Sequence, residues 1–131
     1  MAAPQPVTRT VQQTAPAARL LRDIRGRLEA NIDPAYLDKI RNLVPTESTV
    51  LGVRVPVIRA LAKAFVAEHP EVDLEAAFSL YDACCVRPCR EEMLFAQAVL
   101  ERFRRKFDRG LWPRVNRWID AIDNWEVCDQ L

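Results

Sequence analysis

The stretch RPCREEMLFAQAVLERFRRKF, residues 87–107, decides the fold class of this chain. Pro88 suits the first turn of a helix, and Gly110 suits the position just after one. Between them the apolar residues recur every three or four positions, which is the period of one face of an α-helix: Met93, Ala96, Leu100, Phe103 and Phe107. The pattern predicts one continuous helix of about five turns, the longest in the chain.

The same helical period recurs on both sides of this stretch, and proline or glycine marks the turns between the helical stretches. We expect further helices at residues 15–30, from Pro34 to Pro45, from Pro56 to about Pro70, after Asp73, from Pro113 and from Asn124. Strand-like alternation is absent from the sequence, and glycine is rare. The sequence therefore predicts an all-α protein in which antiparallel helix pairs stack as a HEAT-like α-solenoid, with a compact helical bundle as the alternative.

The first fourteen residues, MAAPQPVTRTVQQT, differ in composition from the rest of the chain. They are rich in Ala, Pro, Gln and Thr and have no hydrophobic period, which is typical of a flexible segment. We therefore expect a flexible N-terminal arm at residues 1–14, followed by a single, partial helical repeat domain at residues 15–131.

The charges are unevenly distributed, although the net charge is only +1. Residues 87–117 contain nine basic and four acidic residues, a local charge of +5. The remainder contains ten basic and fourteen acidic residues, which gives −4. A basic segment of this kind is either a solvated helix face or a surface that contacts phosphate groups.

The four cysteines do not form a pattern typical of a metal site. They are Cys84, Cys85, Cys89 and Cys128, without a C-x-x-C pair, and the single histidine, His69, precedes Pro70. We expect reduced thiols that pack as small apolar residues, and we expect neither a metal nor a cofactor. With no apolar run long enough to cross a bilayer and no secretory signal, we expect a cytoplasmic protein.

Three stretches together resemble a known family. They are GVRVPVIRALAK at residues 52–63, CREEMLFAQAVLERF at 89–103 and DNWEVCDQL at 123–131. In order and spacing they resemble the alkylpurine DNA glycosylases built of HEAT-like repeats, the AlkD family. The family's G-[IVL]-[KR]-x-P-x-x-R segment matches Gly52, Val53, Arg54, Pro56 and Arg59. Its Arg-Glu helix opening matches Arg90 and Glu91, and its W-x-x-x-D pair matches Trp125 and Asp129.

The resemblance implies a concave basic surface that holds duplex DNA and excises cationic alkylated purines such as 3-methyladenine and 7-methylguanine. It implies that Asp129 stabilises the oxocarbenium-like sugar and orients the attacking water, and that Trp125 packs beside it. No cofactor is implied, and an enzyme of this kind would be associated with the nucleoid. The candidate DNA-binding residues are Arg54, Arg59, Arg90, Arg104, Arg105 and Arg117.

The chain also departs from the family pattern, because a further arginine and tryptophan of the family's groove have no counterpart here. We therefore expect the chain to correspond to the N-terminal half of such a protein, with an uncapped C-terminal end that favours a homodimer. Two other functions remain open. The chain could be a HEAT-like module that binds DNA without catalysis, or a helical scaffold that binds a protein.

Overall fold

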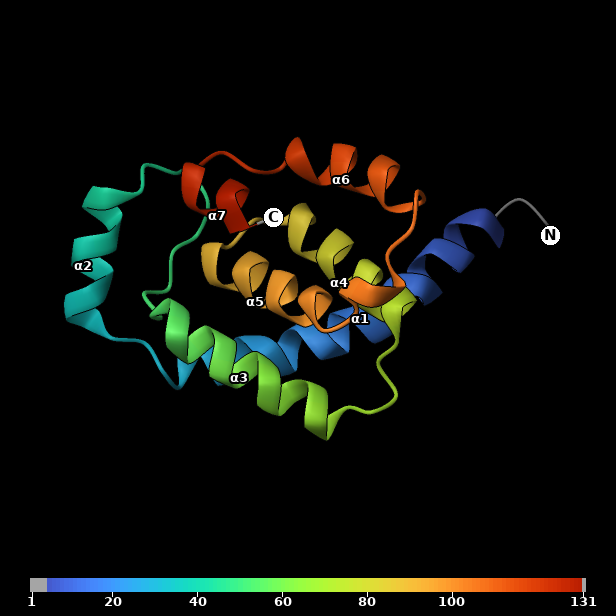
Figure 1. The fold of residues 1–131 in the computed structure, drawn as a ribbon, viewed down its shortest axis with the longest axis horizontal. Helices are drawn as coiled ribbons and strands as arrows, with labels where there is room; N and C mark the ends of the chain where they lie inside the picture. The colour runs from blue at the N-terminus through green and yellow to red at the C-terminus, as the bar shows by residue number, and fades with distance from the viewer. Residues whose placement is uncertain (1–4, 131) are drawn as a thin grey trace.

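The computed structural model describes residues 5–130, apart from the side chains of residues 5–15, Trp125, Asp129 and Gln130. In this part of the chain every regular element is a helix and none is a strand (Figure 1). The helices are α1 (Gln5–Glu29), α2 (Pro34–Leu43), α3 (Val55–Glu68), α4 (Leu74–Val86), α5 (Arg90–Glu101), the 3-10 helix η1 (Arg104–Lys106), α6 (Leu111–Ile119) and α7 (Trp125–Gln130). The prediction of an all-α protein is confirmed.

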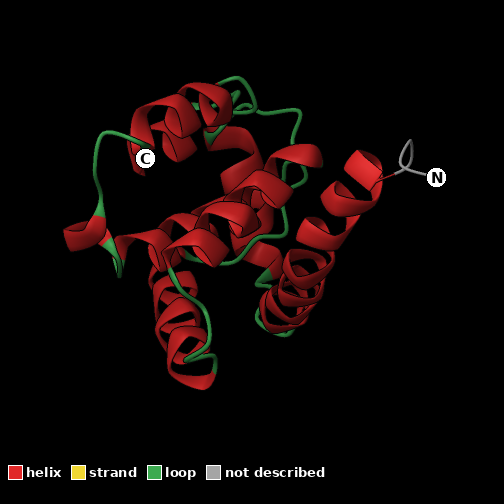
Figure 2. Cartoon of the chain, turned by 90° about the vertical axis from the view of Figure 1, so that its right-hand side faces the viewer, coloured by secondary structure: helices red, strands yellow, loops and turns green. Residues whose placement is uncertain are grey.

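Apart from α2, which lies to one side in Figure 1, the α-helices form two layers (Figures 1 and 2). In one layer α4 packs against α1 and α6, and in the other α5 packs against α3 and α7. The layers meet where α4 packs on α5, and these two helices run in opposite directions across a short turn (Figure 1). Stacked helix pairs of this kind are the arrangement of an α-solenoid, as the sequence predicted.

Three predicted helix starts are confirmed by capping hydrogen bonds. The side chains of Asp33, Asp73 and Asn124 each accept a hydrogen bond from a backbone N–H in the first turn of α2, α4 and α7. The first N–H groups of a helix have no partner within the helix, so these acceptors stabilise its beginning. The helix boundaries at these points follow from local sequence alone.

The core is centred on α5. Every side chain from Arg90 to Leu100 is buried except Ala98, which is half-buried. Its apolar members pack against residues of α1, α3, α4 and α7, and they include Met93, Phe95 and Val99. Three charged residues, Arg90, Glu91 and Glu92, are buried in the same helix. Buried charges need partners, and these partners define much of the site described below.

The predicted five-turn helix over residues 87–107 is wrong in its length. Helix α5 ends at Glu101, and the longest helix is α1. After Glu101 the N–H groups of Arg102 and Phe103 donate to carbonyls three residues back, which tightens the chain into η1. Arg102 and Lys106 are four positions apart, so a continued α-helix would bring their like charges together on one face, where they repel each other.

Helix α1 begins well before the position that the sequence indicated. It runs from Gln5, so residues 5–14, which we expected to be a flexible arm, continue into the predicted first helix without a break. Pro16 lies within this helix, although proline lacks the N–H that the helical ladder uses. The flexibility of the N-terminal segment and the division at residue 14 stay predictions. Across the described residues, the helices are too short or too polar to traverse a lipid bilayer.

Candidate functional site

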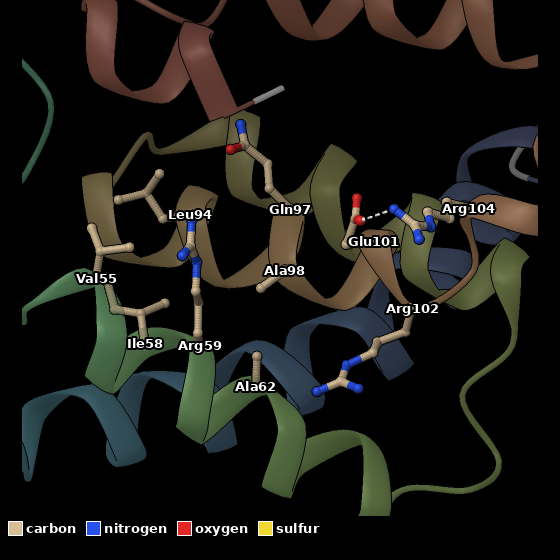
Figure 3. Close-up of a pocket in the computed structure, with 10 residues that line it drawn as sticks. All are labelled: Val55, Ile58, Arg59, Ala62, Leu94, Gln97, Ala98, Glu101, Arg102 and Arg104. Atoms are coloured by element: carbon tan, nitrogen blue, oxygen red, sulfur yellow. Dashed lines mark hydrogen bonds and ion pairs between the residues drawn. The ribbon is translucent and has the colours of Figure 1, made fainter.

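A groove of about 680 Å³ lies on the layer formed by α3, α5 and α7 (Figure 3). Helices α3 and α5 form its two walls, and the turn that follows α5 closes one end. Its lining residues are Val55, Ile58, Arg59, Ala62, Leu94, Gln97, Ala98, Glu101, Arg102 and Arg104. The groove is therefore a continuous surface made from elements about forty residues apart in sequence.

The floor of this groove is apolar and its rim is basic. Buried side chains such as Ile58 and Leu94 form the floor. Three exposed arginines form the rim: Arg59 from α3, and Arg102 and Arg104 from the segment after α5 (Figure 3). The Arg104 guanidinium lies 3.1 Å from the Glu101 carboxylate, and both side chains are exposed. Guanidinium groups on an open rim can bind phosphate oxygens through paired N–H donors.

Two of the predicted DNA-binding residues, Arg59 and Arg104, line the groove. Arg105 in η1 and Arg117 in α6 are exposed, but neither lines it. Arg102 lines the groove and was not predicted, because its local sequence does not distinguish it from the arginines beside it.

Arg54 lies at the start of α3, beside the groove and outside its lining. Its guanidinium lies 3.3 Å from the Asp33 carboxylate and 4.6 Å from the centre of the Tyr36 ring. These contacts hold the side chain against α2 while leaving it exposed. The predicted role of Arg54 in DNA binding stays a prediction.

Arg90 does not have the position that a DNA contact requires. Its side chain is fully buried, and its guanidinium donates to the Glu126 and Glu91 carboxylates, to the Tyr36 hydroxyl and to the Val53 carbonyl. Burial opposes its charge, but Glu126 and Glu91 together hold the pKa of Arg90 above its usual value. A phosphate cannot reach this guanidinium in the structure, so the prediction of Arg90 as a surface contact is corrected.

Glu91 fixes the loop that leads into α3. Its carboxylate is fully buried and accepts hydrogen bonds from three consecutive backbone N–H groups, those of Leu51, Gly52 and Val53, at 2.8, 2.9 and 3.3 Å. Three successive N–H groups directed at one anion form a favourable binding site for it. The Arg90-Glu91 pair matched in the sequence is therefore an internal structural element in this fold.

Helix α7 carries the predicted catalytic residues Trp125 and Asp129, whose side chains lie outside the described residues. The described part of α7 is attached to α5. The Glu126 carboxylate binds Arg90, and the Val127 carbonyl accepts a hydrogen bond from the Gln97 amide at 3.1 Å. These contacts place α7 next to the groove-lining residue Gln97 (Figure 3).

The Gln97 side chain has one unusual feature. It is 7% exposed, and its Nε2 donates to the Tyr81 hydroxyl at 2.6 Å as well as to the Val127 carbonyl. Its Oε1 is buried and has no hydrogen-bond partner among the described residues. Turning the amide over would place Oε1 against the Val127 carbonyl oxygen, which only accepts, so the hydrogen bond to α7 favours the orientation described. Neither Gln97 nor its partners could be identified from local sequence.

Three of the four cysteines have the properties of structural thiols, and Cys128 is the exception because it is exposed. All four are free; Cys84 and Cys89 are buried, Cys85 is half-buried and Cys128 in α7 is exposed. Burial raises the pKa of Cys85 and of Cys89 to about 11, and raises that of Cys84 well above its usual value. A raised pKa lowers the thiolate fraction, so these three thiols are weak nucleophiles.

Comparison with known proteins identifies the family of this fold. A family model described as a DNA alkylation repair enzyme matches residues 24–131, from within α1 to the end of α7. The comparisons with curated proteins and with solved structures gave no match.

Proposed function

Because the chain belongs to the DNA alkylation repair enzyme family, with a role in DNA repair, we propose that it excises cationic alkylated purines from duplex DNA. The substrates are adducts such as 3-methyladenine and 7-methylguanine, and the reaction is hydrolysis of the bond between base and deoxyribose. The observation that supports this proposal most directly is the basic groove, whose lining residue Gln97 is bonded to the backbone of α7.

In this proposal the DNA backbone lies along the groove rim. Arg59, Arg102 and Arg104 bind phosphate oxygens, and this sequence-independent contact supplies most of the affinity. The chain has a net charge of only +1, so binding depends on where these charges are gathered rather than on total charge. Arg90 has no part in this binding, because its donors are used inside the protein.

Helix α7 supplies the chemistry in this proposal. An alkylated purine with a positive charge is already a good leaving group, so its departure needs little acid catalysis. Departure leaves positive charge on the sugar, and the Asp129 carboxylate stabilises that charge and orients the water that attacks it. Trp125, four residues earlier in the same helix, packs against the sugar and the cationic base.

Release of free base from methylated duplex DNA tests this proposal, with unmethylated duplex of the same sequence as the control. We expect the chain to release 7-methylguanine, detected by chromatography, from the methylated duplex only. Binding to both duplexes without release would instead support a HEAT-like module without catalysis. The absence of salt-dependent binding to either duplex would leave a protein-binding scaffold as the better account.

A further inference from the structure

Two polar side chains of α5 hold α7, and we propose that these residues, Arg90 and Gln97, position α7 for catalysis. They are seven residues apart, which is close to two turns of one helix, so they lie on the same face of α5. The inference rests on the proposed function of Trp125 and Asp129. It assigns Arg90 and Gln97 no contact with DNA, and both act through the position of α7.

The first attachment is a paired ionic contact. The Arg90 Nε donates to Glu126 Oε1 at 2.5 Å, and its Nη2 donates to Glu126 Oε2 at 2.8 Å. Two parallel bonds fix the orientation of both groups as well as their distance. Glu126 follows Trp125 directly in α7. The orientation of the Glu126 side chain is therefore linked to the backbone that carries the proposed catalytic pair.

The second attachment acts on the backbone of α7. The Gln97 Nε2 donates to the Val127 carbonyl, and the same nitrogen donates to the Tyr81 hydroxyl in α4. The Val127 side chain is fully buried, so an apolar contact reinforces this polar one. The two attachments bind neighbouring residues of α7: Arg90 binds the side chain of Glu126, and Gln97 binds the main chain of Val127. Together they restrict both the rotation of α7 and its sliding along α5.

Helix α7 depends on such attachments because it is short. It contains 6 residues. Isolated helices shorter than about 12 residues are marginal in water, so α7 owes its stability to contacts with its neighbours. A catalytic carboxylate must also be held near its productive geometry to stabilise charge on the sugar. Loosening α7 would therefore lower the catalytic rate more than it would lower DNA affinity, which depends on the groove arginines.

The same network extends from α7 to the loop before α3. Arg90 donates to Glu91 and to the Val53 carbonyl, and Glu91 holds the N–H groups of the same loop. The loop leads directly to Arg54 at the start of α3. The buried pair Arg90-Glu91 therefore connects α7 to the α3 end of the groove through a continuous set of hydrogen bonds.

The test uses two variants that each weaken one attachment. Glu126→Gln removes the negative charge and one of the two oxygens that Arg90 binds, and Gln97→Leu removes the donor to the Val127 carbonyl. Arg27→Gln is the matched control, because it removes ion pairs with Glu68 in α3 and with Asp23 in α1, and both are remote in sequence from α7. The full chain is used for each, with hydrogen exchange of the α7 amides as the first measurement. We expect these amides to exchange about tenfold faster in both test variants, and at the parent rate in the control.

The second measurement separates positioning from a general effect on folding. Single-turnover base release is measured at saturating methylated duplex, together with duplex affinity. We expect the rate to fall about tenfold in Glu126→Gln and Gln97→Leu while duplex affinity stays within about twofold, because α7 acts on the chemical step. The control Arg27→Gln should keep the parent rate at saturation.

Three results would overturn the inference. The α7 amides could exchange at the parent rate in both test variants. The rate could be unchanged while α7 exchanges faster, or the rate could fall equally in Arg27→Gln. If the parent chain releases no base, the proposed function fails. The exchange of the α7 amides then decides by itself whether Arg90 and Gln97 hold α7.

Discussion

Gly52 and Leu37 are in such close contact that a Cβ atom on Gly52 would lie 2.5 Å from the Cβ of Leu37 and 2.9 Å from its Cα. Gly52 also has a φ of +91°, a backbone conformation that favours glycine. Its carbonyl accepts the N–H of Asp33, and its own N–H donates to Glu91. This contact packs α2 against the loop that enters α3.

Gly52→Ala is therefore expected to destabilise the protein by about 3 kcal/mol, since backbone strain and overpacking each cost about 1–3 kcal/mol. Chemical denaturation followed by circular dichroism measures the change in the free energy of unfolding. Gly26→Ala is the control, because a Cβ there meets no atom within 4 Å. Gly26 lies inside α1, so that variant should gain about 0.5–1 kcal/mol. Equal effects of the two variants would contradict the packing described.

His69 joins α1 to the end of α3 in a pH-dependent contact. Its ring nitrogens lie 2.9 Å from the Glu71 carboxylate and 2.8 Å from that of Asp23. Hydrogen bonds with Glu71 and then Asp23 raise the pKa of His69 above its usual value. The stabilisation is therefore fully present below the unfolded pKa of about 6.5, and is lost as pH rises through the folded pKa.

We predict that His69→Gln lowers the free energy of unfolding more at about pH 6 than at about pH 9, since only protonated His69 forms the charged contact. Urea unfolding of the parent and variant at the two pH values measures this difference. A loss of stability that is the same at both values would show that the contact does not depend on protonation.

The groove arginines should determine how DNA affinity depends on salt. Replacing Arg102 and Arg104 by Gln removes two charges from the groove rim. For every phosphate that the variant no longer binds, the slope of log affinity against log salt should become shallower by about 0.9. Fluorescence anisotropy with a labelled duplex at several salt concentrations measures the slope.

Arg117→Gln is the matched control for this experiment, because Arg117 is exposed on α6 and does not line the groove. The control should keep the slope of the parent. If Arg117→Gln made the slope of log affinity against log salt as shallow as the groove variants do, the DNA would have to lie outside the groove between α3 and α5.

The charge of the damaged base should decide which lesions are released. An ethenoadenine adduct is uncharged, and the proposed mechanism includes no general acid to protonate it. We expect release of ethenoadenine to be at least about a hundredfold slower than release of 7-methylguanine, because the leaving group carries no positive charge. Parallel single-turnover reactions on duplexes that differ only in the lesion measure the ratio. Comparable rates would mean that the protein protonates the base.

Local patterns were enough to predict that each α-helix exists, although not where α1 begins. Proline, glycine and capping residues such as Asp33 and Asp73 mark helix boundaries through interactions within a few residues, and the structure has helices there. The end of α5 was predicted wrongly, because the apolar period continues through Phe103 and Phe107. Both side chains do pack against the core, but they reach it from a tightened turn rather than from a helix.

The site was harder to predict because its partners are distant in sequence. Arginine is usually on the surface, so the sequence alone favours Arg90 as a DNA contact. Its partners Glu126 and Tyr36 lie 36 and 54 positions away, and no local pattern indicates them. A motif indicates Arg59, and a cluster of basic residues indicates Arg104. The identification of Arg102 and Gln97 as parts of the site required knowledge of how α3, α5 and α7 pack together.

The single-turnover rate of Asp129→Asn, measured as free 7-methylguanine from methylated duplex DNA, tests the proposed function most directly. Asn keeps the size and hydrogen bonding of the side chain but cannot neutralise a positively charged sugar. The account predicts a rate about a hundredfold lower, equivalent to about 3 kcal/mol, with duplex affinity nearly unchanged. An Asp129→Asn variant that releases base at the parent rate would contradict it.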